Sequence, residues 1–286
     1  ETIILTALAA MPTNYDVPIN NIILGCHATI TDNKSTPSEY IKSGDWKTDV
    51  GMLIMHAKSK SASELGYNCL VILPDYQGYG NTRYQAHPYL AQEITARQSV
   101  DALRYGIELY KKSKKGRAKI RDGWKTICVG YSQGGSVAMA CHRFMETNFL
   151  DKDLHLGGSV CGDGPYDPIA TMKFSVEEDK VFMPVAIPLI LKGMLDYNPY
   201  MRRHKAKDFT EKFLKTGILD WIELKEQNVL DIQKALRRFY KFHKDKRGDY
   251  LKASEIFTPE VFAFMSKKIK GEPTEKNPKF DDLYSA

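Results

Sequence analysis

The chain has 286 residues, 43% of them hydrophobic, and a formal net charge of +6 at pH 7. These values suit one large domain, or a core with a substantial insertion, and exclude a disordered chain. The longest apolar run, residues 181–195, is broken by two prolines and a lysine, so no membrane-spanning segment is expected. Two local basic runs, 111–121 and 237–247, are typical of solvated faces, so no nucleic-acid partner is expected.

Strands and helices are predicted to alternate over the first 161 residues. Strands are predicted at 1–10, 21–26, 69–73, 125–129 and 156–161, and helices at 48–60, at 88–112 and after residue 134. This alternation predicts a parallel, doubly wound α/β sheet. Reactive groups gather at the carboxyl ends of such strands. His27, Asp75, Ser132 and Asp163 fall at those ends.

The pattern changes at about residue 171. Helical periodicity continues to the end with no convincing strand, at 181–195, 206–215, 218–226, 229–240 and 259–269. Aromatic residues are dense in this part of the chain. They suit the core of a helical bundle, and they also suit a cap or lid that closes over an active site. The two interpretations are compatible, because a cap needs a core of its own.

The five cysteines are expected to be buried thiols. Cys26, Cys69, Cys128 and Cys161 fall in apolar strands, and Cys141 falls on the buried face of a helix. An odd number of cysteines at core positions does not fit a disulfide framework. The pattern therefore favours a reducing or thiol-tolerant compartment.

The most specific motif is Gly130-Tyr131-Ser132-Gln133-Gly134, between a predicted buried strand and a predicted helix of small residues. This order is typical of a nucleophile elbow, the sharp turn that exposes a reactive serine. Glycine at 130 and 134 avoids collisions within the turn. The helix N-terminus directs N–H groups toward an oxyanion formed beside Ser132. The alternative interpretation is an ordinary glycine-rich turn between a strand and a helix.

The chain resembles the α/β-hydrolase superfamily, and within it the secretory lipases similar to lipase A and their bacterial relatives. The resemblance is carried by His27-Ala28-Thr29 with Pro37-Ser38 downstream, by Pro74-Asp75-Tyr76-Gln77-Gly78, and by the elbow motif. It implies a hydrolase core over residues 1–170 and a helical cap or lid over 171–286. It further implies hydrolysis of small-molecule or lipid carboxylic esters, with no cofactor.

The resemblance also implies roles for individual residues. Ser132 would be the nucleophile, and the backbone N–H of Gln133 would form one arm of the oxyanion hole. The second arm is expected from the backbone at His27 or Ala28. The side chain of His27 has two interpretations, as a support for its loop or as the general base. Asp75, Tyr76 and Tyr131 are assigned to the turn and the pocket rim.

The triad acid and histidine are not found with the nucleophile. In the family they follow the elbow, each after a strand beyond the cap, and no such strands are predicted here. The sequence therefore suggests an incomplete chain, lacking an initiator Met and the last two strands, with a sheet that ends at strand 156–161. Asp163 is the candidate acid at the correct sheet edge, and an ordinary turn is the alternative for that residue.

Three functions stay open at this stage. A serine esterase or lipase is the first, and a serine peptidase or amidase of the same fold is the second. The third is a non-catalytic protein of this fold that binds an apolar ligand, which the missing acid and histidine favour. The compartment is open as well, because the thiols favour the cytoplasm whereas the resemblance implies export.

Overall fold

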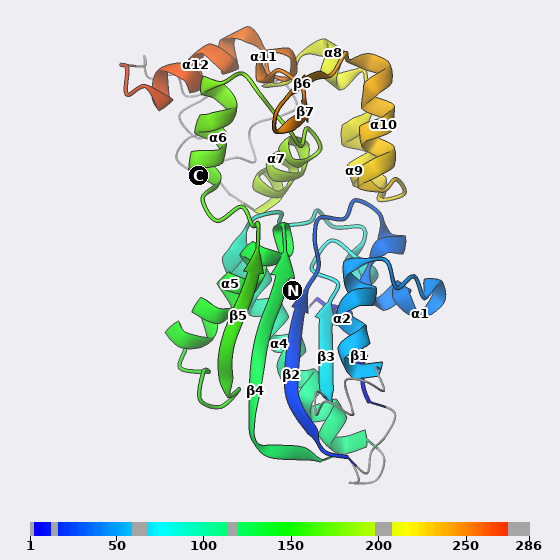
Figure 1. Ribbon diagram of the computed structural model, residues 1–286. Coiled ribbons are helices and arrows are strands. Elements are labelled where there is room, and N and C mark those ends of the chain that lie inside the picture. Colours follow the sequence, from blue (N-terminus) through cyan, green and yellow to red (C-terminus); the bar gives the residue numbers. More distant parts are fainter. Residues whose placement is uncertain (1–2, 13–16, 59–67, 114–118, 198–207, 274–286) are drawn as a thin grey trace. The chain divides into compact units, whose positions relative to one another are not determined.

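A computed structural model describes residues 3–12, 17–58, 68–113, 119–197 and 208–273. The chain forms two compact units (Figure 1). The first comprises Glu1–Gln85 and Leu90–Tyr166, and the second comprises Ala86–Tyr89 and Asp167–Ala286. The second unit thus begins four residues before position 171, where the sequence predicts the helical segment to start.

A five-stranded sheet forms the centre of the first unit, in the order β1-β3-β2-β4-β5 (Figure 1). Its strands are β1 (Ala7–Ala10), β2 (Ile19–Cys26), β3 (Cys69–Pro74), β4 (Ile120–Tyr131) and β5 (Leu156–Gly162). β1 is antiparallel to β3, and the other pairs are parallel. The predicted α/β class with a mostly parallel sheet is confirmed.

The two edges of the sheet differ in how well the sequence predicts them. The first strand begins at Ala7 and is shorter than the predicted 1–10. The apolar residues of this segment extend to the N-terminal side of Ala7, beyond the residues that pair with β3. Composition alone does not show where the pairing begins. At the other edge, β5 is the last strand of this sheet, as predicted, and Val160 on it is 60% exposed.

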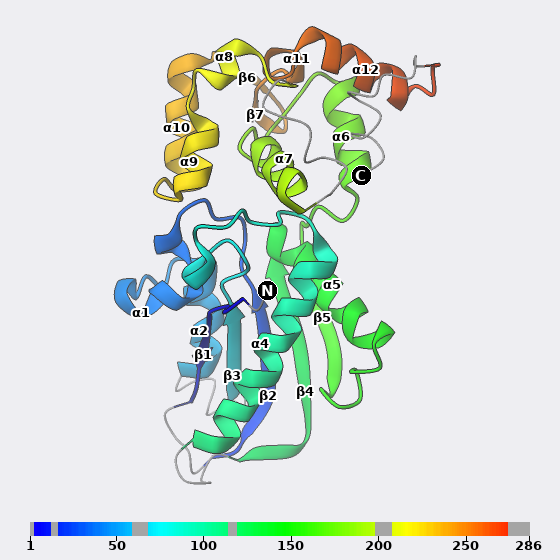
Figure 2. The ribbon, with the colours of Figure 1, turned by 180° about the vertical axis from the view of Figure 1, so that it is seen from behind.

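Helices cover both faces of the sheet, which Figures 1 and 2 show from opposite sides. α4 (Gln92–Lys112) and α5 (Gln133–Thr147) pack on one face, and α2 (Asp49–Lys58) packs on the other. The strands supply both cores because successive side chains point to opposite faces. Ile22 and Leu24 of β2 join the α4–α5 core, whereas Ile23 joins the α2 core. α1 (Tyr40–Ser43) and three short 3₁₀ helices, Asn33–Ser35, Pro37–Glu39 and Gly80–Thr82, lie in the loops.

The prediction of free thiols is confirmed, and the prediction of burial is confirmed for all of the cysteines except Cys161, which lies on the edge strand β5. All five are free thiols. Cys26, Cys69, Cys128 and Cys141 are buried, and Cys161 on the edge strand is partly exposed.

The second unit is mainly helical. Its helices are α6 (Pro168–Glu177), α7 (Ala186–Tyr197), α8 (Glu211–Leu214), α9 (Ile218–Leu224), α10 (Val229–Phe239), α11 (Ala253–Ile256) and α12 (Pro259–Ile269). None of the described helices of the chain has the length and apolar character needed to cross a membrane.

The prediction of no strand after residue 171 is wrong. β6 (His243–Asp245) and β7 (Gly248–Tyr250) form an antiparallel hairpin in this unit. The strands are three residues long and carry charged side chains, so they lack the apolar alternation that identifies a strand in sequence. The tight turn between them is stabilised by the Arg247 N–H, which donates to Asp245 Oδ1 at 2.8 Å.

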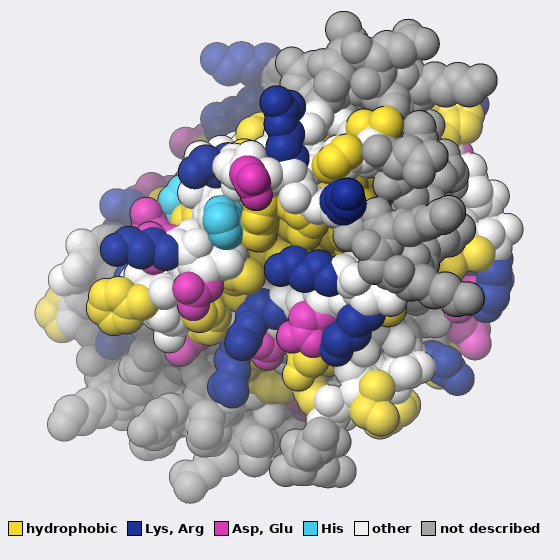
Figure 3. Space-filling view, turned by 90° about the horizontal axis from the view of Figure 1, so that it is seen from below, with side chains coloured by type: hydrophobic (Ala, Val, Ile, Leu, Met, Phe, Trp, Pro, Cys, Tyr) yellow, Lys and Arg dark blue, Asp and Glu magenta, His cyan; other side chains and the backbone are white. Residues whose placement is uncertain are grey.

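Figure 3 views the molecule from below relative to Figure 1. On this face lysine and arginine side chains are interspersed with aspartate and glutamate side chains and with exposed apolar side chains.

The packing of α4 leads to a first prediction. Leu103 is fully buried in the core between α4 and the sheet, whereas Leu109 on the same helix is 55% exposed. Leu103→Ala should lower the free energy of unfolding by about 2–5 kcal/mol, because it leaves a cavity. Leu109→Ala is the matched control and should change it by less than about 0.5 kcal/mol. Urea unfolding measures both, and equal losses would contradict this packing.

Candidate active site

Ser132 occupies a strained turn between β4 and α5. Its φ is 54° and its ψ is −124°, a backbone conformation that non-glycine residues rarely adopt. The turn is stabilised on both sides, since the Ser132 N–H donates to Gly162 O at 2.8 Å and the Gly135 N–H donates to Ser132 O at 2.9 Å. The side chain of Ser132 is partly exposed at the N-terminal end of α5. This geometry is typical of a nucleophile elbow.

The glycines beside Ser132 leave no room for a side chain. A Cβ on Gly130 would lie 2.1 Å from Gly134 O, and a Cβ on Gly134 would lie 2.0 Å from Cys26 O. Both neighbouring atoms belong to the backbone, so neither can move aside cheaply. The elbow therefore lies directly against the carboxyl end of β2, as the pairing of Cys26 with Gly130 requires.

The predicted oxyanion-hole residues lie at the elbow and on the adjoining loop. Gln133 is the first residue of α5 and is buried, so its N–H belongs to the positive end of the helix. The Ala28 N–H donates to Asp49 Oδ2 at 2.6 Å, so the prediction of this N–H as an oxyanion donor is wrong for the conformation described, because a carboxylate already accepts its hydrogen. Asp49 also accepts the Val50 N–H at 2.9 Å in the first turn of α2. The sequence analysis did not identify Asp49 as the partner of the loop after β2. The one sequence feature that could have indicated it is the position of this acidic residue in the first turn of a helix.

The His27 side chain is buried and faces its own loop. Its Nδ1 lies 2.7 Å from Ala28 O and its Nε2 lies 3.2 Å from Asp75 O. The ring stacks on Tyr76 with a centroid distance of 4.0 Å. Both ring nitrogens thus face backbone carbonyls, which suits the interpretation of His27 as a support for the loop and does not favour its use as general base.

Asp75 organises the loops at the end of β3. Its carboxylate is fully buried and accepts three hydrogen bonds, from Thr6 Oγ1 at 2.5 Å, Ser38 Oγ at 2.6 Å and the Ser38 N–H at 2.8 Å. A buried carboxylate is tolerated when its oxygens are hydrogen-bonded in this way. Asp75 therefore joins three segments that are distant in sequence. Thr6 and Ser38 were not identified as partners from the sequence.

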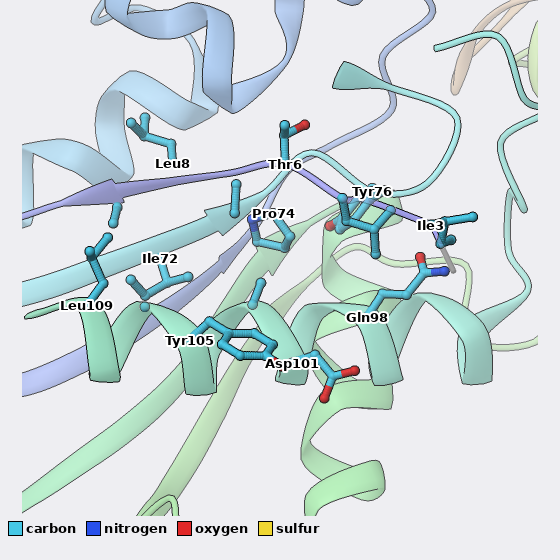
Figure 4. Close-up of a pocket in the computed structure, with 15 residues that line it drawn as sticks. Ile3, Thr6, Leu8, Ile72, Pro74, Tyr76, Gln98, Asp101, Tyr105 and Leu109 are labelled. Carbon is cyan, nitrogen blue, oxygen red and sulfur yellow. The ribbon is translucent and has the colours of Figure 1, made fainter. Parts of the chain in front are cut away.

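A cavity of about 510 Å³ lies between the N-terminal segment, β3 and α4 (Figure 4). Its lining is mainly apolar and includes Tyr76, which the sequence assigns to a pocket rim. Ser132 does not line this cavity. The contact of Tyr76 with this cavity is therefore no evidence for a role at the nucleophile.

Tyr131 and Asp163 lie next to each other at the ends of β4 and β5. Tyr131 is 58% exposed, and its hydroxyl donates to Asp163 Oδ2 at 3.4 Å. Asp163 is exposed and adopts a positive φ of 45°. The carboxylate of this candidate acid thus contacts a phenol, and in the described residues it has no imidazole partner.

Among the residues that the structure describes, no imidazole forms a hydrogen bond with Ser132. His142 lies 3.4 Å from Glu146, and His155 stacks on Trp124. His204 lies outside the described residues. Within the same part of the chain, no group of three histidine, cysteine or acidic residues is placed to hold a metal ion.

The core beneath the elbow is kept uncharged. Burial raises the pKa of Tyr76 and of Cys128 well above their usual values. A hydrogen bond with Cys26, together with burial, raises the pKa of Cys141. These groups therefore stay protonated at neutral pH.

Comparison with known proteins extends this picture. No protein-family model and no curated protein matches the chain. Solved structures match over nearly its whole length. A point mutant of the rice cell wall degrading esterase LipA from Xanthomonas oryzae has a TM-score of 0.72 and 21% identity, covering 98% of this chain and 66% of that one. The unmutated esterase has a TM-score of 0.69 and 21% identity, covering 98% and 65%.

A more distant match is lipase A from Candida antarctica in its closed state. Its TM-score is 0.57 at 12% identity, and the match covers 96% of this chain and 57% of the lipase. The present chain therefore spans about two thirds of the length of the esterase and less of the lipase. At such low identity the likeness concerns the fold, and the chain has the α/β-hydrolase fold of these esterases and lipases.

The glycine contacts at the elbow lead to a second prediction. Gly130→Ala should lower the free energy of unfolding by about 3 kcal/mol or more, because backbone atoms have to move. Gly123 lies on the same strand, and a Cβ added there would have no atom within 4 Å, although its φ is +77°. Gly123→Ala is thus the control and should cost about 1–2 kcal/mol from backbone strain alone. Urea titration of both variants checks the difference, and a smaller loss for Gly130→Ala would refute the close contact.

Proposed function

We propose that this chain carries the nucleophile of a serine hydrolase that cleaves carboxylic esters. The observation that carries the proposal is the strained backbone of Ser132, with φ 54° and ψ −124°, at the junction of β4 and α5. Strain of this kind is retained where it serves a function, here the exposure of a hydroxyl at a helix N-terminus. The α/β-hydrolase fold shared with known esterases and lipases supports the same reaction class.

The reaction would proceed through an acyl-enzyme. Ser132 Oγ attacks the ester carbonyl carbon and loses its proton to a general base, and the carbonyl oxygen becomes an oxyanion. The Gln133 N–H and the backbone N–H of His27 would stabilise that oxyanion, because the Ala28 N–H is already donated to the Asp49 carboxylate. Collapse of the intermediate breaks the bond to the alcohol, which leaves with a proton. Water then releases the acid by the same steps and restores Ser132.

The loops around Ser132 would act by positioning. Asp49 holds the Ala28 N–H, and Asp75 joins the loop after β3 to Thr6 and Ser38. Such contacts would hold the loops in place before the oxyanion forms, and preorganisation of this kind is a main source of rate enhancement in sites that stabilise an oxyanion. In the same proposal the second unit serves as a cap, and small-molecule or lipid esters are the substrates.

A second candidate is a non-catalytic protein that binds an apolar ligand. It is favoured by one observation, that no described imidazole hydrogen-bonds Ser132. Without a base the serine hydroxyl is a poor nucleophile. The two candidates differ in a single measurable property, the reactivity of Ser132.

A fluorophosphonate probe tests that reactivity. The protein should be labelled at Ser132. Ser132→Ala should abolish labelling and lower ester turnover at least about 10⁴-fold, because the attacking atom is removed. Ser159→Ala, at an exposed serine of β5, is the control and should leave both unchanged.

The outcomes separate the candidate functions. Absence of labelling would refute the hydrolase and favour ligand binding. Turnover of p-nitrophenyl esters of two acyl lengths, compared with an aminoacyl anilide, distinguishes an esterase from a peptidase. Faster cleavage of the anilide would overturn the choice of ester substrates.

A further inference from the structure

One of the two basic runs of the chain lies in a short segment of the second unit. Residues 237–247 contain six lysine and arginine residues and one acidic residue, whereas the whole chain has a net charge of +6. The segment comprises the end of α10, a short connection, and the β6–β7 turn. We call its exposed basic side chains, Arg238, Lys241, Lys244 and Lys246, the basic hairpin surface.

The acidic residues around this surface already have partners. Asp249 of β7 pairs with Arg237 at 2.6 Å, and Asp245 of β6 pairs with Lys180 at 3.1 Å. Asp231 of α10 pairs with Lys234 at 3.3 Å. Among the described residues, none of the four side chains of the basic hairpin surface has an ion-pair partner. Their charge is therefore available to an external anion.

The segment is ordered by contacts with its neighbours. Arg237 connects α10 to β7 through Asp249, and its guanidinium lies 4.4 Å from the centre of the Phe242 ring. Arg247 lies over the Phe174 ring of α6 at 4.5 Å. The four cations without an ion-pair partner among the described residues are thus carried on a folded scaffold, which lowers the entropy cost of ordering them on binding.

An aromatic side chain accompanies these cations. Phe239 follows Arg238 at the end of α10 and is 42% exposed. Exposed aromatic residues beside lysine and arginine are typical of surfaces that lie on a bilayer, with the ring at the headgroup level and the cations on anionic lipids. Nucleic acid would use the same cations, but a platform for stacked bases needs several exposed rings, and within the described residues 237–250 Phe239 alone is exposed among the aromatic side chains.

We propose that the basic hairpin surface binds the anionic headgroups of a lipid membrane. This proposal does not depend on the reactivity of Ser132. Each lysine or arginine near an anionic membrane strengthens binding about fivefold at physiological salt. Removal of three of the four cations should therefore weaken binding about 100-fold. Higher salt should weaken it as well, because the cations are exposed to solvent.

Sedimentation with lipid vesicles tests the proposal. Chain 1–286 should bind vesicles of phosphatidylcholine with about 30% phosphatidylserine far more tightly than vesicles of phosphatidylcholine alone. The triple variant Arg238→Gln, Lys241→Gln, Lys244→Gln should bind the anionic vesicles about 100-fold more weakly. The triple variant Lys111→Gln, Lys112→Gln, Lys119→Gln loses the same charge from exposed positions of the first unit, and it should bind like the wild type.

The possible outcomes are all informative. Equal losses in the two triple variants would show that net charge alone drives binding and would overturn the proposal, as would unchanged binding of the hairpin variant. Tighter binding to a short DNA duplex than to anionic vesicles at the same salt would also overturn it. Should the triple variant have a lowered Tm, Lys246→Glu in the exposed turn replaces it, with an expected loss of at least about tenfold.

Discussion

The close contact between Gly134 and the end of β2 is the constraint on which the rest of the site depends. The carbonyl oxygen of Cys26 occupies the space that a Cβ at 134 would need. Parallel pairing of β2 with β4 places Cys26 beside Gly130, so the two strands end together and the chain has to turn at once. The turn forces Ser132 into its strained conformation and starts α5 immediately after it. The pairing of β2 with β4 and the lack of side chains at Gly130 and Gly134 together produce the sharp turn at Ser132.

Buried and partly buried carboxylates then order the loops around that turn. Asp49 holds the backbone after β2, and Asp75 holds the backbone after β3 together with Thr6 and Ser38. Each carboxylate accepts charge-assisted hydrogen bonds, which are stronger than neutral ones and are worth most where water is excluded. His27 completes this arrangement by lying between the carbonyls of Ala28 and Asp75. The polar residues at the sheet edge therefore position the backbone around Ser132.

The second unit distributes its polar groups differently. Ile232 and Leu236 of α10 are fully buried, whereas its charged residues lie mainly on the exposed side. Ion pairs with Asp249 and Asp245 connect the hairpin to α10 and to Lys180. These pairs neutralise the acids and leave the neighbouring cations free. The same two ion pairs therefore hold the hairpin in place and leave its other basic side chains without an acidic partner among the described residues.

Local pattern in the chain was enough to predict one group of features. Alternation of apolar runs with helical periodicity predicted the parallel sheet and its helices, and the apolar neighbours of four cysteines predicted their burial. Gly130 and Gly134 predicted a sharp turn at Ser132. Other features depend on contacts between segments that are distant in sequence, and these contacts exist only in the folded chain. The β6–β7 hairpin lacks an apolar pattern, and the environment of His27 depends on Asp75, which lies 48 residues away. Similarly, the Ala28 N–H meets a carboxylate 21 residues further along the chain. Periodicity records which side chains avoid water, whereas the partner of a buried polar group is set by which loops the folded strands bring together.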